Sequence, residues 1–306
     1  MIVLLGASGA VGSRLARRLV ARGESVRALV RREGVLLPSS VERVKGDLLD
    51  PSGLAPVFEG AEVVYYLVHA MGRQPHGERD LVAEDRAQAV SACEAAKKAG
   101  NPRFVYVSGL GASALAPSAH LRGRFAVEDV LRESGLPHVI FRAGVLLGPG
   151  SVGFEMLLRG VRAPFLPLPA WTDLPMQPFA LADLLDALVR AAREDAFLGR
   201  AIPLGVSDTL TYAELFKRAA KAMGLQPVTM DMPRPLAPVG PLAVAMGGSV
   251  PYREAEALVE SMVTSPFVVD DGGKAMKELG IPMRTFEEAL ALALRDAVRE
   301  GAVVGS

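Results

Sequence analysis

The stretch that most constrains this chain is GASGAVG, from Gly6 to Gly12, which follows the apolar run IVLL and precedes SRLARRLVARG. Gly6 is placed to end a strand in a tight turn, Gly9 to let the backbone approach a pyrophosphate, and Gly12 to let a helix pack on the strand. The first N–H groups of that helix are then free to bind phosphate. A glycine pattern alone also fits a turn without a ligand, but the flanking strand and helix favour a dinucleotide site. The residues expected to form it are Gly6, Ser8, Gly9, Ala10, Val11 and Gly12.

Short runs rich in valine, isoleucine and aromatic residues alternate with helical segments up to about residue 150. We expect strands over residues 2–5, 25–30, 41–46, 62–68, 103–109 and 138–143. Such alternation predicts an α/β fold, a Rossmann-type doubly wound parallel sheet whose ligands bind at the carboxyl ends of the strands. We therefore expect an NAD(P)-binding domain over residues 1–150. Residues 151–306 are expected to form a smaller C-terminal substrate lobe that partly returns to the sheet and covers the cofactor cleft.

Composition excludes several classes of partner. Lys plus Arg and Asp plus Glu number 34 each, and no basic patch carries interleaved aromatic residues, so we expect no nucleic-acid partner. We expect no signal peptide, because Met1 is followed directly by IVLL with no basic region and no cleavage site. We also expect no membrane span, because the uncharged stretch 236–252 is short and broken by proline and glycine. That stretch is expected to be a loop and helix covering a cleft. The single Cys93 is expected to be buried in a helix. Because one thiol cannot form an internal disulfide, we expect a protein of the reducing cytoplasm.

The spacing G-x-x-G-x-x-G, together with the following helix and the strand SVRALVRR, resembles the opening of extended and atypical short-chain dehydrogenase/reductases. Where an NAD-preferring enzyme of this kind has an acidic residue, this chain has Arg31 and Arg32, and the resemblance places Arg31 at the 2′-phosphate of NADP. The expected cofactor is NADP(H), with NAD(H) less favoured. Two solvated arginines at a strand end are the alternative.

Further cofactor contacts follow from the same resemblance. The segment GDLLD matches the family's Gly-Asp segment, which implies that Asp47 and Leu48 lie beside the adenine. Leu67, Val68 and His69, at the end of YYLVHAM, are expected to line the path of the ribose and pyrophosphate. A hydrogen-bonded histidine at a strand end is the equally weighted alternative for His69.

The catalytic pattern departs from that of typical reductases, which use a serine near the fifth strand and a Tyr-x-x-x-Lys pair on the next helix. Here Ser108 falls near the serine position, while His120 falls on the tyrosine position and Arg124 on the lysine position. Spacing of i to i+4 puts both on one helix face. Arg124 is expected to bind the ribose without giving up a proton, and His120 to titrate near neutrality as an acid or base. A helix-start histidine and a solvated arginine are the alternative.

The chain resembles the NmrA-like branch of that superfamily, in which the Tyr-x-x-x-Lys pair is missing. Two functions stay open. One is an NADP-dependent oxidoreductase acting on a small carbonyl, enone or quinone-like substrate, with His120 and Ser108 near the reacting oxygen and Arg124 completing the catalytic set at the ribose. The other is a non-catalytic NADP(H)-sensing regulatory or assembly protein. Whether it is an enzyme, the substrate and the oligomeric state are left open by the sequence.

The second half offers fewer signals. Asp183 is expected to cap a helix, and Thr211 with Glu214 and Thr285 with Glu288 are expected to form capping boxes. Apolar residues expected either to line a substrate pocket or to pack in the core are Phe154, Met156, Phe165, Trp171 and Phe179. We expect no metal site, because His69, His76, His120 and His138 share no ligand spacing.

Overall fold

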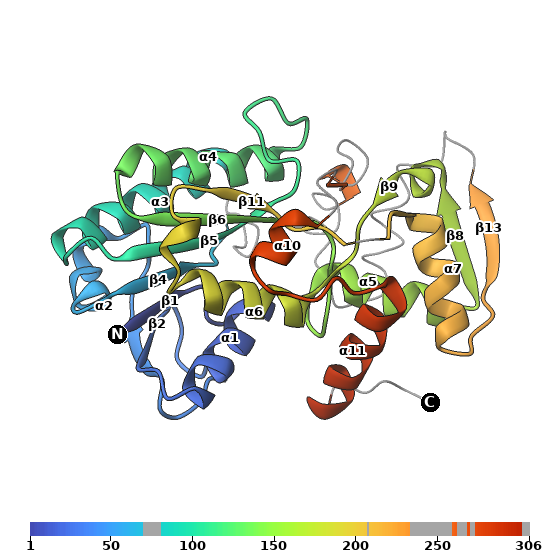
Figure 1. The fold of residues 1–306 in the computed structure, drawn as a ribbon, viewed down its shortest axis with the longest axis horizontal. Helices are drawn as coiled ribbons and strands as arrows, with labels where there is room; N and C mark the ends of the chain where they lie inside the picture. The colour runs from blue at the N-terminus through green and yellow to red at the C-terminus, as the bar shows by residue number, and fades with distance from the viewer. Residues whose placement is uncertain (70–80, 207, 233–258, 262–267, 270–272, 302–306) are drawn as a thin grey trace. The chain divides into compact units, whose positions relative to one another are not determined.

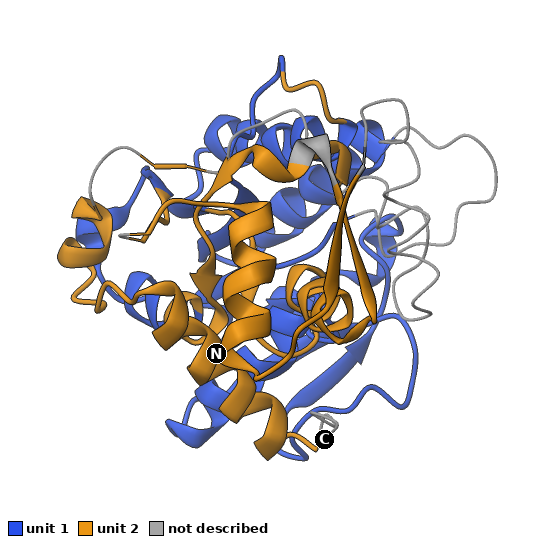
Figure 2. Cartoon of the chain, turned by 90° about the vertical axis from the view of Figure 1, so that its right-hand side faces the viewer, with its two compact units in different colours: residues 1–115, 119–142, 185–202 blue, residues 116–118, 143–184, 203–306 orange. Residues whose placement is uncertain are grey.

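The computed structural model of the chain describes residues 1–306 except 70–80, 207, 233–258, 262–267, 270–272 and 302–306. The chain groups into two compact units, which are described separately (Figure 2). Unit 1 comprises residues 1–115, 119–142 and 185–202. Unit 2 comprises residues 116–118, 143–184 and 203–306.

Unit 1 is built on a seven-stranded sheet with the strand order β11-β6-β5-β4-β1-β2-β3 (Figure 1). The strands are β1 (Ile2–Leu5), β2 (Val26–Val30), β3 (Glu42–Lys45), β4 (Val63–Tyr66), β5 (Arg103–Gly109), β6 (His138–Ala143) and β11 (Ala201–Pro203). From β3 to β5 each neighbouring pair is parallel. Reading from β3 to β6, this is the strand order of dinucleotide-binding Rossmann sheets, whose ligand crevice lies where the order reverses. The α/β Rossmann expectation and its strands are confirmed.

Helices cover both faces of this sheet. On one face lie α3 (Leu81–Lys98) and α4 (Ala119–Ser134), and on the other lie α1 (Ala10–Ala21) and the unit-1 part of α6 (Leu181–Ala191) (Figure 1). Shorter pieces are η1 (Pro51–Gly53), α2 (Ala55–Phe58) and η4 (Asp195–Phe197). Adjacent tyrosines of β4 show how the strand alternates. Tyr66 packs in the core beneath α3 and α4, whereas the Tyr65 hydroxyl donates to the Leu188 carbonyl oxygen of α6 at 3.1 Å.

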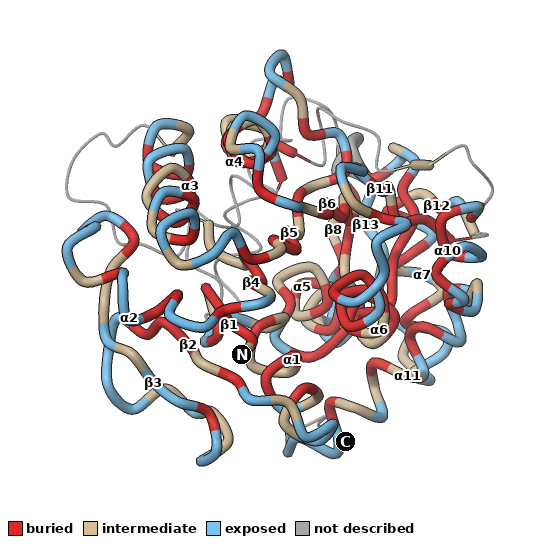
Figure 3. The backbone as a smooth tube through the Cα atoms, turned by 60° about the vertical axis from the view of Figure 1, so that its left-hand side comes forward, coloured by how far each residue is buried: buried red, intermediate tan, exposed pale blue. Residues whose placement is uncertain are grey.

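Burial explains the composition of the strands. All four residues of β1 are buried, whereas β3, the outermost strand on one side of the sheet, is mostly exposed (Figure 3). Continuous apolar runs are the pattern of parallel strands covered on both faces. Cys93 lies buried in α3, as expected, and burial raises the pKa of its thiol to about 11.

Unit 2 consists of small sheets and helices. Its two-stranded sheets pair β7 (Leu146–Leu147) with β10 (Phe179–Ala180), β9 (Pro175–Met176) with β12 (Leu210–Thr211), and β8 (Phe165–Pro169) with β13 (Val228–Met232). Its helices are α5 (Val152–Arg162), η3 (Ala170–Asp173), the start of α6, α7 (Tyr212–Ala222), α10 (Lys274–Glu278) and α11 (Phe286–Arg299). Across the described ranges, no helix of either unit has the length and apolar character needed to cross a membrane.

The helix starts of unit 2 test the expected caps. Thr211 accepts a hydrogen bond from the Glu214 amide at 3.1 Å, and the Glu214 carboxylate accepts one from the Thr211 amide at 2.7 Å. The same box forms between Thr285 and Glu288. Both predicted capping boxes are confirmed. Asp183 does not precede its helix, because α6 begins two residues earlier, and its buried carboxylate accepts a hydrogen bond from Arg284 Nε at 2.9 Å.

The apolar residues expected either in a pocket or in the core divide between buried and exposed positions. Phe154, Met156 and Phe179 are buried. Phe165 is 59 % exposed on β8 and is therefore not a core residue. The side chain of Trp171 lies outside the described part, as do His76 and the stretch 236–252 that was expected to cover a cleft.

Candidate functional site

The glycine turn ends β1 at the point where the strand order of the sheet reverses. Gly6 has φ of +90°, a conformation that side chains disfavour, and a Cβ atom there would lie 2.6 Å from the Leu67 carbonyl oxygen. The Leu67 amide in turn donates to the Leu5 carbonyl oxygen at 2.9 Å. The backbone leaving β4 therefore passes directly over this turn, and only glycine fits at position 6.

The next two glycines have different surroundings. A Cβ atom at Gly12, in the first turn of α1, would lie 2.8 Å from the Ala7 Cα, so the absence of a side chain lets the helix pack on the turn. Gly9 precedes α1 in extended conformation, and a Cβ atom there would meet only the Gly6 carbonyl oxygen, at 3.5 Å. Ser8 and Gly9 are exposed, and Ala10 and Val11 are half-buried.

The start of α1 has the features of an anion site. No side chain caps the helix at Gly9, and its first turn carries no acidic residue. The free first-turn N–H groups and the positive end of the helix dipole therefore face the open side of Gly9. These residues fit the diphosphate of a dinucleotide.

The ends of β2 and β3 lie at the same sheet edge, because Val30 pairs with Lys45. Arg31, the next residue after β2, is exposed, as is Arg32. Past β3, the Asp47 carboxylate accepts a hydrogen bond from the Leu49 amide at 2.9 Å, which fixes its turn.

Leu48 occupies a different environment from its neighbour Asp47. Its side chain is buried in the core cluster of unit 1, at 4 % exposure. A ligand beside this turn would therefore meet the Leu48 backbone and not its side chain.

His69 lies three residues past β4, after the half-buried Leu67 and Val68. Burial, with the positive charges of Arg124 and Arg31, lowers the pKa of its imidazole to about 3. Among the described residues, no group hydrogen-bonds its buried Nδ1. Because β2 and β4 both pair in parallel with β1, Arg31 and His69 follow their strands at the same end of the sheet.

The end of β5 and the start of α4 bring the expected catalytic residues to this edge. Arg124 donates from Nη1 to the Val107 carbonyl oxygen at 3.1 Å, next to Ser108. Ser108 is 3 % exposed, and within the described ranges neither its Oγ nor Arg124 Nε has a hydrogen-bond partner. His120 lies one helical turn before Arg124, near enough to Arg124 and His69 for their charges to act on it.

The protonation state of His120 differs from the expectation. Burial and the charges of Arg124 and His69 hold its pKa well below the ordinary value of 6.5. The expectation that His120 titrates near neutrality is wrong, because its environment beside the Arg124 cation depends on packing that no local sequence pattern indicates. Its imidazole is neutral at physiological pH and donates or accepts hydrogen bonds without charge.

Several supporting residues escaped the sequence analysis. The Tyr106 hydroxyl of β5 donates to the Arg124 carbonyl oxygen at 3.2 Å, and the rings of Tyr106 and Tyr66 meet edge to face. The buried carboxylate of Glu128 binds Arg142 and Arg132. The spacing of Glu128, four residues after Arg124 on the same helix, was the available signal.

Comparison with known proteins identifies a family model and several similar proteins. Residues 6–163 match a family model described as NAD(P)H-binding, which spans the glycine turn, His69, Ser108, His120 and Arg124. A ceramide reductase of Caulobacter vibrioides is 32% identical over 246 residues, covering 77% of this chain and 74% of that protein.

One further similarity is in sequence and another is in structure. The mitochondrial NADH dehydrogenase [ubiquinone] 1 alpha subcomplex subunit 9 of Arabidopsis thaliana is 27% identical over 249 residues, covering 76% of this chain and 60% of that subunit. Among solved structures, the NADPH complex of the quinone oxidoreductase QOR2 of Escherichia coli superposes with a TM-score of 0.76 at 21% identity, covering 96% of this chain and 100% of that one. At that identity the superposition shows the shared fold.

Proposed function

We propose that this chain, which belongs to the NAD(P)H-binding family within the atypical short-chain dehydrogenase/reductases, is an NADP(H)-dependent oxidoreductase acting on a carbonyl, enone or quinone-like substrate. The observation that carries the proposal is the convergence of Arg124, His120 and His69 at the sheet edge that the glycine turn opens. This arrangement supports the proposal, because it would set hydrogen-bonding groups where a dinucleotide's nicotinamide half would extend from the helix start.

The cofactor end of the site favours NADP(H). Arg31 follows β2 and is exposed, so its guanidinium is available to a 2′-phosphate at this end of the sheet. The open side of Gly9 and the uncapped start of α1 would hold the diphosphate. Asp47, two residues after β3, would lie beside the adenosine half.

The reacting end is formed by residues of β5 and α4. NADPH, when bound, would supply the hydride that reduces the substrate carbon. Ser108 Oγ and the neutral imidazole of His120 would donate hydrogen bonds to the substrate oxygen and hold it toward the nicotinamide. Arg124, held by the Val107 carbonyl oxygen, would donate its remaining N–H groups to the ribose.

Reduction of a carbonyl also requires a group that donates a proton to the substrate oxygen. A phenol or an imidazolium gives up a proton readily, but a neutral imidazole does not. The negative charge of a bound NADPH favours the imidazolium, so we propose that His120 becomes the acid only in the cofactor complex.

A second candidate is a protein that binds NADP(H) without turning it over and serves in sensing or assembly. It is favoured by the neutral state of His120, by the helix α4 without tyrosine, and by the similarity to a respiratory-complex subunit.

One experiment separates the two functions. The purified chain is mixed with NADPH and a panel of aldehydes, enones and quinones. Ceramide is included because the Caulobacter vibrioides relative is a ceramide reductase. Oxidation of NADPH is followed by the absorbance of its reduced nicotinamide. Consumption that depends on one substrate class supports the reductase. Tight NADPH binding with a flat absorbance trace across the whole panel supports the sensing or assembly protein.

A further inference from the structure

Helix α4 carries polar residues at every fourth position. His120, Arg124, Glu128 and Arg132 follow one another at this spacing, which places neighbouring members on the same side of the helix, about 6 Å apart along its axis. The first two belong to the proposed site. Glu128 is different, because its side chain is entirely buried although it carries a carboxylate.

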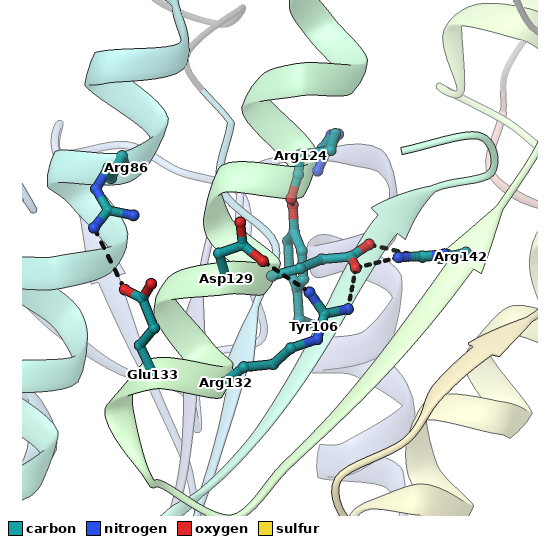
Figure 4. A network of polar contacts seen from close by, with 8 residues as sticks. Arg86, Tyr106, Arg124, Asp129, Arg132, Glu133 and Arg142 are labelled. Carbon is teal, nitrogen blue, oxygen red and sulfur yellow. Dashed lines mark hydrogen bonds and ion pairs between the residues drawn. The ribbon is translucent and has the colours of Figure 1, made fainter. Parts of the chain in front are cut away.

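Two arginines bind that carboxylate from different elements (Figure 4). Arg142, near the end of β6, donates from Nε to Glu128 Oε1 at 2.9 Å and from Nη2 to Oε2 at 2.5 Å. Arg132 donates from Nη2 to Oε2 at 2.5 Å, but it belongs to α4 itself. Of these two pairs, the Arg142 pair joins the helix to strand β6, whereas the Arg132 pair stays within the helix.

The geometry of that pair is restrictive. Two parallel hydrogen bonds between a guanidinium and a carboxylate fix orientation as well as distance. Glu128 lies one turn after Arg124, whose carbonyl oxygen accepts the Tyr106 hydroxyl and whose Nη1 binds the Val107 carbonyl oxygen. The Glu128–Arg142 pair therefore fixes α4 to β6 one helical turn after Arg124, which is itself bound to β5.

Stability alone is a poor reason for this arrangement. Glu128 loses all its contact with water and Arg142 most of it, which costs about as much as their attraction returns, and such pairs are often replaceable by apolar residues without loss. What such a pair supplies is one defined geometry.

We propose that Glu128 and Arg142 are positioning residues that set the axial placement of α4, so that Arg124 and His120 reach the cofactor and substrate. The inference rests on the proposed function, because it requires Arg124 to contact NADP(H). Neither Glu128 nor Arg142 touches the cofactor itself; each acts through Arg124.

The test compares Arg142→Gln with Arg132→Gln, a matched control that also removes a guanidinium from Glu128 but leaves α4 tied to β6. NADPH affinity is measured by fluorescence titration at a temperature where thermal melting shows both variants folded. We expect Arg142→Gln to weaken NADPH binding about tenfold and Arg132→Gln to bind like wild type. Equal affinities in both variants, whatever their melting temperatures, would overturn the proposal.

A double-mutant cycle then distinguishes positioning from general damage. If Arg142 acts through Arg124, Arg142→Gln should have no further effect on NADPH affinity in an Arg124→Ala background. A full tenfold loss in that background would overturn the positioning role. An Arg124→Ala variant that binds NADPH normally would instead refute the cofactor contact that the proposed function assigns to Arg124.

The conservative variant Arg142→Lys keeps the charge but not the paired hydrogen bonds, and it covers the case in which Arg142→Gln does not fold. We expect it to weaken NADPH binding measurably while the melting temperature changes little. Wild-type affinity in Arg142→Lys would show that charge alone suffices and would contradict the geometric role.

Discussion

Gly12 packs on the glycine turn so closely that a Cβ atom added to it would lie 2.8 Å from the Cα of Ala7. At Gly9, three residues earlier, a Cβ atom would meet the Gly6 carbonyl oxygen alone, at an ordinary contact distance of 3.5 Å. The spacing of the motif therefore assigns separate tasks to its glycines. The fold requires a glycine at position 12, whereas at position 9 it leaves an open side where we propose that the diphosphate binds.

This difference predicts opposite outcomes for two substitutions. Gly9→Val puts a branched side chain where the diphosphate should approach the backbone, while the protein has room for it. We expect a folded protein, by circular dichroism and thermal melting, that has lost binding of both NADPH and NADH. The matched variant Gly12→Val should lose stability instead, because its side chain overlaps the turn. Normal binding by a folded Gly9→Val protein would place the cofactor elsewhere.

Cofactor preference provides a second prediction. A charge-assisted hydrogen bond contributes about 1.5–3 kcal/mol, so Arg31→Ala should weaken NADPH binding by about tenfold to over a hundredfold. NADH lacks the 2′-phosphate, and its affinity should change little. Calorimetric titration of both cofactors measures the ratio.

The neighbouring arginine offers a control for this prediction. Arg32→Ala removes the same charge from the same strand end, but only Arg31 lies near enough to lower the pKa of His69. We expect Arg32→Ala to keep most of the preference. If both variants lose it equally, the effect comes from net charge at the strand end and not from a contact.

Much of this site could be predicted from the sequence because its parts follow local rules. The glycine turn, the strands and the two capping boxes each depend on a few neighbouring residues. The spacing of His120 and Arg124 likewise placed both on one helix. Each of these features is confirmed as structure, while the roles assigned to the residues are still predictions.

What the sequence did not indicate depends on contacts between distant segments. Burial beside Arg124 makes His120 neutral, and Arg142, fourteen residues after Glu128, pairs with it across a helix and a strand. Phe165, which suited a core or a pocket by residue type, lies on the exposed side of a two-stranded ribbon. No local pattern encodes these environments, because each is set by the packing of one element on another.

The histidines also predict how stability depends on pH. Burial and nearby arginines lower the pKa of His69 from 6.5 to about 3 in the folded protein. Below pH 6.5 the unfolded chain therefore takes up a proton that the folded protein does not, so this stability is present above pH 6.5 and is lost as the pH falls toward 3. Urea unfolding at pH 7.5, 6 and 5 should show a smaller decline in His69→Gln than in wild type. Parallel declines in the two proteins would contradict the buried, neutral state of His69.

His120 is the proposed proton donor to the substrate oxygen. If it donates that proton, His120→Ala should lose about 10²- to 10⁴-fold in turnover, the usual contribution of a positioned acid or base, and should bind NADPH almost normally. Arg124→Ala should lose cofactor affinity together with turnover, because it removes the ribose donor.

The pH profile of turnover tests the same residue independently. The His120 pKa lies well below its ordinary value in the protein alone, and the negative charge of NADPH should raise it in the complex. Turnover should therefore fall as the pH rises through that raised pKa, and the dependence should vanish in His120→Ala. A wild type that binds NADPH tightly but consumes none with any substrate, and whose binding is indifferent to His120, would instead identify the sensing or assembly protein. The two variants therefore decide between chemistry and cofactor sensing, since only a reductase has a turnover that His120 can change while leaving the cofactor bound.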